Sequence, residues 1–314
     1  MIYSKLGGTG IEVSGLCFGT LTIGPLQKNF PLEEGSNLLR VASEMGVNFY
    51  DTAEIYDTYA YLKPVVKAYP GTVIATKCYA YDSKTAEDSF ARAVKGLGRE
   101  WVDIFLLHEQ ESVHTLRGHL EALEYFQKKK EEGYIGALGM STHHVEGVKA
   151  AATHPLIEVI EAILNHKGWG IIDGSLKEME EALEEARSRG KGIIAMKPLG
   201  GGHLIREREE ALTYIRNLRF IDSVALGIQS RKELNYALAY LSGRENGLTA
   251  GDMPDISDRQ LIIEPWCTGC GRCVSVCGHQ AMHLRGARAE VDGAKCVLCG
   301  YCGAACPQLA IKVV

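Results

Sequence analysis

The position of the cysteines constrains this chain more than any other feature of its sequence. The 314 residues contain ten cysteines, and eight of them lie in the last 48 residues. The start of the chain shows no apolar export segment, so we expect reduced thiols in a cytoplasmic protein. Reduced thiols at this density in a short segment indicate metal ligands rather than disulfides.

The eight cysteines form two runs with the same spacing, C-x2-C-x2-C-x3-C. The first run is Cys267, Cys270, Cys273 and Cys277, and the second is Cys296, Cys299, Cys302 and Cys306. This spacing is typical of [4Fe–4S] ligation, in which the fourth cysteine of each run binds the other cluster. We predict one cluster on Cys267, Cys270, Cys273 and Cys306, and another on Cys296, Cys299, Cys302 and Cys277. Two structural zinc sites are the alternative, but zinc sites usually combine two C-x2-C pairs per metal.

The residues before the cysteine-rich tail predict an α/β fold. Short apolar runs predict eight strands, at residues 15–19, 48–51, 73–77, 102–108, 135–141, 159–165, 192–197 and 223–227. Helical periodicity lies between them, at residues 32–44, 85–97, 116–130, 176–188 and 232–241. This alternation favours a (β/α)8 TIM barrel, preceded by a β-hairpin. An open doubly wound sheet is the alternative, but no G-x-G-x-x-G turn follows the first strand.

The organisation that follows has three parts. We predict a barrel over residues 1–245, a linker over 246–262, and a small bacterial-ferredoxin-like α+β domain over 263–314. No apolar run is long enough to predict a membrane span. The net charge is −5, and thiolates balance the five basic residues of the tail, so no nucleic-acid partner is expected.

Four polar side chains lie at or just after the ends of three successive predicted strands. Asp51, Lys77 and His108 end strands two to four, and Tyr56 follows Asp51 by five residues. Active sites of TIM barrels lie at this end of the strands. Tyrosine is a weak acid with a pKa of about 10. We expect Lys77 to lower the pKa of Tyr56, Asp51 to keep Lys77 charged, and His108 to bond a substrate oxygen.

Such a group would donate a proton to a carbonyl oxygen while hydride reaches the carbon. The alternative is structural: His108 and Tyr56 would pack in the core, and Lys77 and Asp51 would form an ion pair. Of the two remaining cysteines, Cys17 is expected in the core. Cys78 follows Lys77 at the mouth of the barrel, and packing is the role expected for it.

Three segments closely resemble signature stretches of the aldo-keto reductases: DTAEIY at 51–56, IATK at 74–77 and DIFLLH at 103–108. The opening hairpin, Gly19 and Thr20 resemble the start of that family, and the resemblance extends to about residue 242. With its tail, the chain resembles ferredoxin-fused aldo-keto reductases of anaerobic bacteria and archaea. The resemblance implies a catalytic tetrad of Asp51, Tyr56, Lys77 and His108, with Tyr56 as proton donor.

The resemblance also implies positions that hold NADP(H). These are Gly19, Thr20, Ser141, Thr142, Asn165, Lys197, Ser230 and Arg231. Arg231 suits the 2′-phosphate of NADPH. The glycines at 200–202 would either approach a pyrophosphate or form a flexible loop. Two departures count against strong binding: Met196 replaces an aromatic residue under the nicotinamide, and Tyr236-Ala237 replaces the Glu-Asn pair that holds adenine.

We therefore expect an oxidoreductase that acts on a small-molecule carbonyl or alcohol with NADPH. Its two clusters would exchange electrons with an external redox protein docked on the ferredoxin-like domain. NADPH releases two electrons together, whereas each cluster normally carries one. Two alternatives therefore stay open: a ferredoxin-linked reductase without nicotinamide, and an electron-transfer protein on a barrel that has lost its activity.

Overall fold

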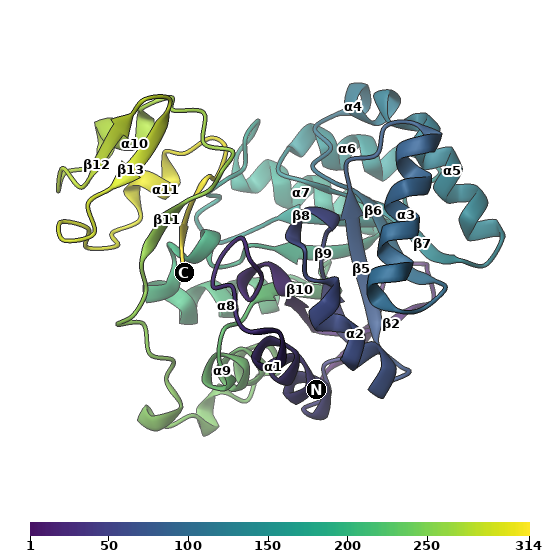
Figure 1. Cartoon of the computed structure of the whole chain (residues 1–314), viewed down its shortest axis with the longest axis horizontal. Coiled ribbons are helices and arrows are strands. Elements are labelled where there is room, and N and C mark those ends of the chain that lie inside the picture. Colours follow the sequence, from purple (N-terminus) through teal and green to yellow (C-terminus); the bar gives the residue numbers. More distant parts are fainter.

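The computed structural model describes residues 1–314, and its largest part is a closed barrel of eight parallel strands (Figure 1). The order around the barrel is β10-β3-β4-β5-β6-β7-β8-β9. The strands are β3 Leu16–Gly19, β4 Phe49–Asp51, β5 Val73–Cys78, β6 Val102–Leu107, β7 Ile135–Thr142, β8 Val159–Ile163, β9 Gly192–Met196 and β10 Ser223–Gly227. Most of their residues are buried, because helices cover one side and packed side chains fill the other. The predicted TIM barrel is confirmed.

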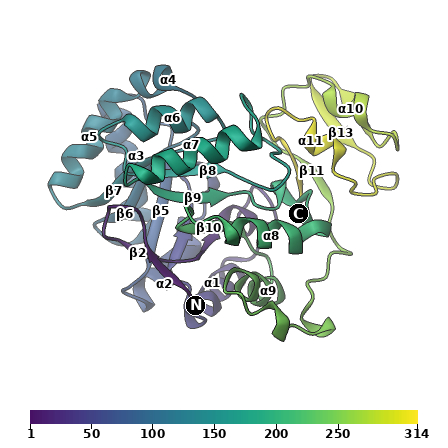
Figure 2. The ribbon, with the colours of Figure 1, turned by 180° about the vertical axis from the view of Figure 1, so that it is seen from behind.

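Helices surround the barrel (Figures 1 and 2). They are α1 Leu32–Glu44, α2 Tyr59–Ala68, α3 Ser83–Leu97, α4 Val113–Gly118, α5 Leu120–Glu131, α6 Val145–Thr153, α7 Leu176–Ser188, α8 Arg208–Asn217 and α9 Arg231–Leu241. The predicted helices do not include α2, α6 or α8, and the helix predicted at residues 116–130 spans parts of both α4 and α5. The three missed helices have at most ten residues each, too few for a clear helical period. None of the helices has the length and apolar character needed to span a membrane.

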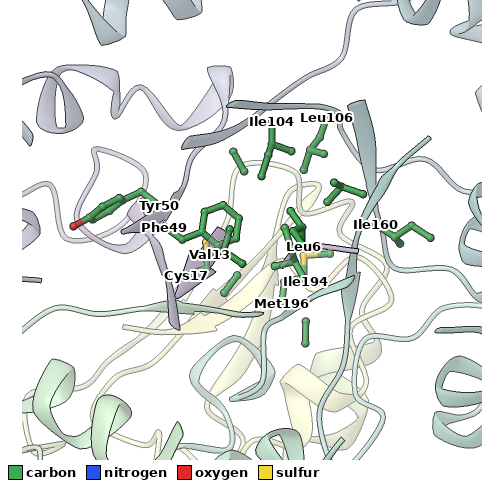
Figure 3. Packing of buried hydrophobic residues seen from close by; sticks show 14 of the residues in the cluster. Leu6, Val13, Cys17, Phe49, Tyr50, Ile104, Leu106, Ile160, Ile194 and Met196 are labelled. Carbon is green, nitrogen blue, oxygen red and sulfur yellow. The ribbon is translucent and has the colours of Figure 1, made fainter. Parts of the chain in front are cut away.

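One apolar cluster of 66 buried residues fills the barrel and the layer beneath its helices (Figure 3). The predicted hairpin is present as β1 Tyr3–Lys5 and β2 Glu12–Ser14, and it closes the N-terminal end. Leu6 and Val13 from this hairpin belong to the cluster, and a side chain on Gly192 would collide with Leu6. Cys17 and Cys78 are both buried in the cluster, as expected for packing residues.

Residues 261–314 form a smaller region beside the barrel, yellow in Figures 1 and 2. Its strands β11 Leu261–Ile263 and β14 Ile311–Val313 pair antiparallel, as do β12 Met282–Arg285 and β13 Arg288–Val291. Two short helices, α10 Arg272–Val276 and α11 Tyr301–Ala304, carry cysteines. This small α+β region, which we call the cysteine region, buries an apolar cluster of only six residues.

The cysteine region packs against the C-terminal face of the barrel through β14. Gly202 has φ +91°, and a Cβ there would lie 2.1 Å from the carbonyl oxygen of Val313. His203 Nε2–H donates to the carbonyl oxygen of Ile311 at 2.9 Å. Leu309 is part of the barrel's own apolar cluster. The glycines at 200–202 therefore allow β14 to approach the barrel closely.

Candidate active site

A buried lysine between two carboxylates lies at the C-terminal end of the barrel. Lys77 is the penultimate residue of β5 and is 1% exposed, and its Nζ contacts Asp51 Oδ1 on β4. The same Nζ lies 2.9 Å from Glu161 Oε2 on β8. Burial alone lowers the pKa of Lys77, but Asp51 and Glu161 outweigh it and raise that pKa well above its ordinary value. The amine is therefore a permanent cation at neutral pH.

Glu161 is a member of this group that the sequence analysis missed. A signal was present, because Glu161 interrupts an otherwise apolar run in β8. An unpaired carboxylate is rarely placed in a buried parallel strand, so its presence indicates a buried partner. Burial, followed by the charge of Glu161, raises the pKa of Asp51 above its ordinary value. The lysine thus holds together two carboxylates that would otherwise repel each other.

Tyr56 and His108 lie beside the lysine. Tyr56 follows β4, and Lys77 Nζ lies 5.5 Å from the centre of its ring. The His108 ring meets Tyr56 edge-on, with 5.8 Å between ring centres, and stacks on Tyr79 at 4.6 Å. The structure therefore brings the four predicted tetrad residues together at one place.

The net pKa of Tyr56 is raised, although Lys77 by itself lowers it as expected. Burial raises it well above its ordinary value, and the opposing effect of Lys77 is smaller. Burial also lowers the pKa of His108, and the charges of Lys77 and Lys197 add to that effect. His108 is therefore a neutral ring, and its Nδ1 is shielded from solvent without a hydrogen-bond partner. Both groups are uncharged at neutral pH, which suits hydrogen bonding to a carbonyl oxygen.

Two adjoining cavities meet at these residues. The larger, of about 530 Å³, is lined by Tyr56, Tyr79, His108 and Ser141 from the barrel and by Trp266, Pro307 and Gln308 from the cysteine region. The narrower, of about 170 Å³, runs past Gly19, Lys197, Arg208, Tyr236 and Arg259. Tyr56, Met196, Lys197 and Lys312 line both. Both parts of the chain thus build the walls of one site.

The eight tail cysteines gather in the two predicted crossed sets. Cys267, Cys270, Cys273 and Cys306 line one small cavity. In the other set, burial and then neighbouring Cys296, Cys299 and Cys277 raise the pKa of the Cys302 thiol. Backbone N–H groups of Ala281 and Ala310 donate to the sulfurs of Cys277 and Cys306, each at 3.3 Å. Four converging sulfurs with N–H donors fit a [4Fe–4S] cluster in each set.

Comparison with known proteins now decides the family. The aldo/keto reductase family matches residues 15–239, and a 4Fe-4S dicluster domain matches residues 266–310. This chain belongs to the aldo/keto reductase family. The predicted family, with its ferredoxin-like addition, is thereby confirmed.

Individual relatives are distant. The chain is 24% identical over 215 residues to L-galactose dehydrogenase of Arabidopsis thaliana, covering 64% of this chain and 66% of the relative. It is 26% identical over 235 residues to 6-dehydroglucose reductase of Novosphingobium aromaticivorans, covering 64% and 70%. The chain thus spans about two thirds of the length of these curated relatives. Its structure also resembles the holo form of a Bacillus halodurans aldo-keto reductase, with a TM-score of 0.63 and 18% identity. This match covers 78% of the present chain and 94% of the Bacillus halodurans chain.

The positions expected to hold nucleotide in this aldo/keto reductase divide into two groups. Gly19 and Lys197 line the narrower cavity, and Ser141 lines the larger one. The remaining five line neither cavity: Thr20, Thr142, Asn165, Ser230 and Arg231. Arg208 and Arg259, which the sequence analysis did not select, are the arginines that line the narrower cavity.

Local hydrogen bonds explain why four of those five side chains are turned away. Thr20 Oγ1 donates to the Asp51 carbonyl at 3.0 Å, and Thr142 Oγ1 accepts from the His144 N–H at 3.0 Å. The Asn165 amide bonds both the carbonyl oxygen and the N–H of Trp169, at 2.9 and 3.0 Å. Ser230 caps α9 by accepting from the Glu233 N–H at 3.2 Å. Arg231 is exposed at the start of α9.

These contacts also test whether a whole dinucleotide fits. The narrower cavity alone is smaller than the roughly 300–1,000 Å³ typical of ligand sites, and together with the adjoining larger cavity the site lies within that range. Lys312 and Val313 of β14 lie against Gly201 and Gly202, where a pyrophosphate would approach the backbone. With the cysteine region packed in this way, β14 covers the glycine backbone that a pyrophosphate would approach, and no step below uses NADP(H).

Proposed function

We propose that this chain interconverts a carbonyl compound and its alcohol, with Tyr56 as the group that protonates the carbonyl oxygen. The observation that carries the proposal is the grouping of Tyr56, His108, Lys77 and Asp51 beside a cavity of about 530 Å³. A small-molecule carbonyl compound is the substrate class that this arrangement suits.

The acid–base step follows from the charges. A carbonyl oxygen in the cavity accepts hydrogen bonds from the Tyr56 hydroxyl and the neutral His108 ring. When two electrons from the redox protein and a proton from solvent water reach the carbon, a C–H bond forms and the oxygen becomes an alkoxide, a far stronger base than a phenolate. Tyr56 then gives up its proton despite its raised pKa, and Lys77 stabilises the phenolate that remains. The same steps in reverse oxidise an alcohol.

The source of electrons is the second part of the proposal. The crossed cysteine sets would hold two [4Fe–4S] clusters, which supply single electrons from an external redox protein. Trp266 and Pro307, which adjoin Cys267 and Cys306, line the cavity that also contains Tyr56. This placement and the covering of the glycine backbone by β14 favour the ferredoxin-linked alternative over the expected NADPH-dependent reaction.

The test is an anaerobic assay on a panel of aldehydes and ketones. We expect turnover with reduced methyl viologen, and no binding of NADPH up to millimolar concentration. Tyr56→Phe should lower kcat by about 10²–10⁴-fold, with the iron–sulfur absorbance unchanged. Tyr81→Phe, which alters an exposed tyrosine, is the matched control. A fully active Tyr56→Phe would remove the acid–base role, and micromolar NADPH affinity would restore the nicotinamide mechanism.

A further inference from the structure

Two lysines from different parts of the chain lie where the two cavities meet. Lys197 follows β9 of the barrel, and Lys312 is the middle residue of β14. Both line both cavities, together with Tyr56. The stem of Lys312 crosses Gly201, where a Cβ would lie 3.0 Å from Lys312 Cδ. The absence of a side chain at Gly201 leaves room for this lysine to enter the site.

Neither lysine has a carboxylate partner. Lys312 is 3% exposed, and its Nζ is shielded from solvent without a hydrogen-bond partner. Lys197 Nζ donates to His143 Nε2 at 2.7 Å, a neutral acceptor. Lys77, in the same site, contacts two carboxylates instead. A buried ammonium group without an anion is costly, and burial lowers the pKa of both lysines, that of Lys312 to about 7. An anion bound between the two amines would keep both of them charged.

The backbone at Lys197 supports a role for its side chain. Lys197 has φ +58°, a left-handed conformation that only a few per cent of non-glycine residues adopt. Glycine or asparagine would occupy this position with less strain. A lysine in this strained conformation points to a role for its amine at the site.

The neighbouring carboxylate, Glu264, limits how much negative charge a ligand of the two lysines can carry. Glu264 follows β11, accepts from Gln27 Nε2 at 3.3 Å, and leaves its Oε2 shielded and unpartnered. Lys197, Lys312 and Glu264 together carry a formal charge of +1, and Glu109, which lines the larger cavity, adds a further negative charge near both lysines. A single carboxylate would bring less repulsion from Glu109 and Glu264 than a phosphate dianion.

We infer that Lys197 and Lys312 form a subsite for the carboxylate of an anionic carbonyl substrate. This inference rests on the proposed function, because the carbonyl of the same molecule would reach Tyr56 and His108 in the adjoining cavity. Lys312 is then a binding residue that the cysteine region contributes to the barrel's site. Neutral carbonyl compounds of the same shape would leave both amines unpaired.

The test compares 4-carboxybenzaldehyde with its neutral methyl ester. Dissociation constants are measured by calorimetry on the cluster-loaded full chain, anaerobically and without reductant. We expect the acid to bind about tenfold more tightly than the ester, because charge-assisted hydrogen bonds are roughly twice as strong as neutral ones. Lys312→Gln and Lys197→Asn should each remove most of this preference by weakening the acid alone. Lys232→Gln, the same charge change at an exposed position on α9, should preserve it.

Other outcomes overturn the inference. Equal binding of acid and ester by the native chain would overturn it. So would a Lys312→Gln variant whose affinities for acid and ester fall equally while its iron–sulfur absorbance and melting temperature are unchanged. Glu264→Gln should tighten binding of the acid, because it removes a nearby negative charge. Unchanged acid binding in this variant would mean that Lys312 pairs structurally with Glu264 and does not bind the ligand. Tyr56→Phe separates the two proposals: it should lose turnover and keep the acid preference. A native chain that prefers the acid but reduces no carbonyl would leave the subsite standing and refute the proposed function.

Discussion

The barrel and the cysteine region are held together by different means. The barrel buries one apolar cluster of 66 residues, whereas the cysteine region buries six, of which Cys273 and Cys302 are two. A segment of about 50 residues rarely buries enough apolar surface to fold without metal or disulfide support. Burial of apolar side chains should therefore stabilise the barrel, whereas ligation of the iron–sulfur clusters by its cysteines should stabilise the cysteine region. Because β14 contributes Lys312 to the lining of the candidate active site, loading of the clusters should also decide whether that lining is complete.

Removal of iron should separate the two regions and produce the largest effect. We expect chelation to abolish hydrogen-exchange protection over residues 261–314, because ligand binding supplies the folding free energy of small metal domains. The barrel strands should keep their protection. Mass spectrometry of exchange in loaded and chelated protein measures both. Cys273→Ser should lower the iron content, and Cys17→Ala, in the barrel core, should not. If residues 261–314 stayed fully protected without iron, the cysteine region would not depend on metal ligation for its fold.

How far the sequence predicts each region depends on the range of the interactions involved. Local periodicity and fixed cysteine spacing predicted the barrel strands and both crossed sets of thiols. The packing of β14 against Gly202 joins residues that are distant in the chain and leaves no local pattern. The position of Lys312 in the site was therefore not predictable. The net direction of the Tyr56 pKa was not predictable for a related reason: Lys77 lowers this pKa as expected, but the depth at which the finished fold buries the ring outweighs that effect.

The Asn165 and Thr142 positions show a different limit. The family resemblance indicated where nucleotide contacts should lie, but both side chains bond to nearby backbone groups in this chain. Polar side chains of this kind often satisfy local backbone groups, and sequence alone does not reveal which partner prevails. Glu161, in contrast, was detectable as a charge inside an apolar strand.

Lys77→Met tests a place where the barrel depends on charge rather than apolar burial. Without the cation, Asp51 and Glu161 are left buried and facing each other, which should cost about 3–5 kcal/mol of unfolding free energy. Urea denaturation of the barrel, followed by far-UV circular dichroism, measures the loss. Adding Asp51→Asn and Glu161→Gln should recover most of it. If the single variant were as stable as the native chain, the three charges would not be coupled.

Gly202→Ala tests the contact between the two regions. The new Cβ would lie 2.1 Å from the Val313 carbonyl oxygen. The alanine would also have to adopt φ +91°, a backbone conformation that is strained for a residue with a side chain. We expect packing of β14 to weaken by about 3 kcal/mol, at the upper end of the cost of a strained backbone position. Exchange protection of β11 and β14 should fall while the barrel strands are unchanged. Gly247→Ala, where a Cβ meets nothing within 4 Å, is the control.

His203 should make the same contact sensitive to acid, with a smaller effect. Burial lowers the pKa of His203 from its ordinary value of 6.5 to about 4, which the bond to the Ile311 carbonyl only partly offsets. The packed state therefore disfavours the protonated ring. Its stability is fully present above pH 6.5 and declines as the pH falls toward 4. Linkage gives a loss of about 2 kcal/mol at pH 5.

Trp169 provides the measurement, because its ring packs 3.3 Å from the Cβ position of Gly300 in the cysteine region. In a chain with Trp101 and Trp266 replaced by phenylalanine, the emission of Trp169 reports whether the regions are in contact. His203→Gln keeps an N–H donor but does not titrate, so its emission should stay constant over the same pH range. An identical acid transition in both variants would assign the effect to carboxylates or to cluster loss. A transition confined to the native histidine would show that this one buried ring couples the pH to the closure of the site.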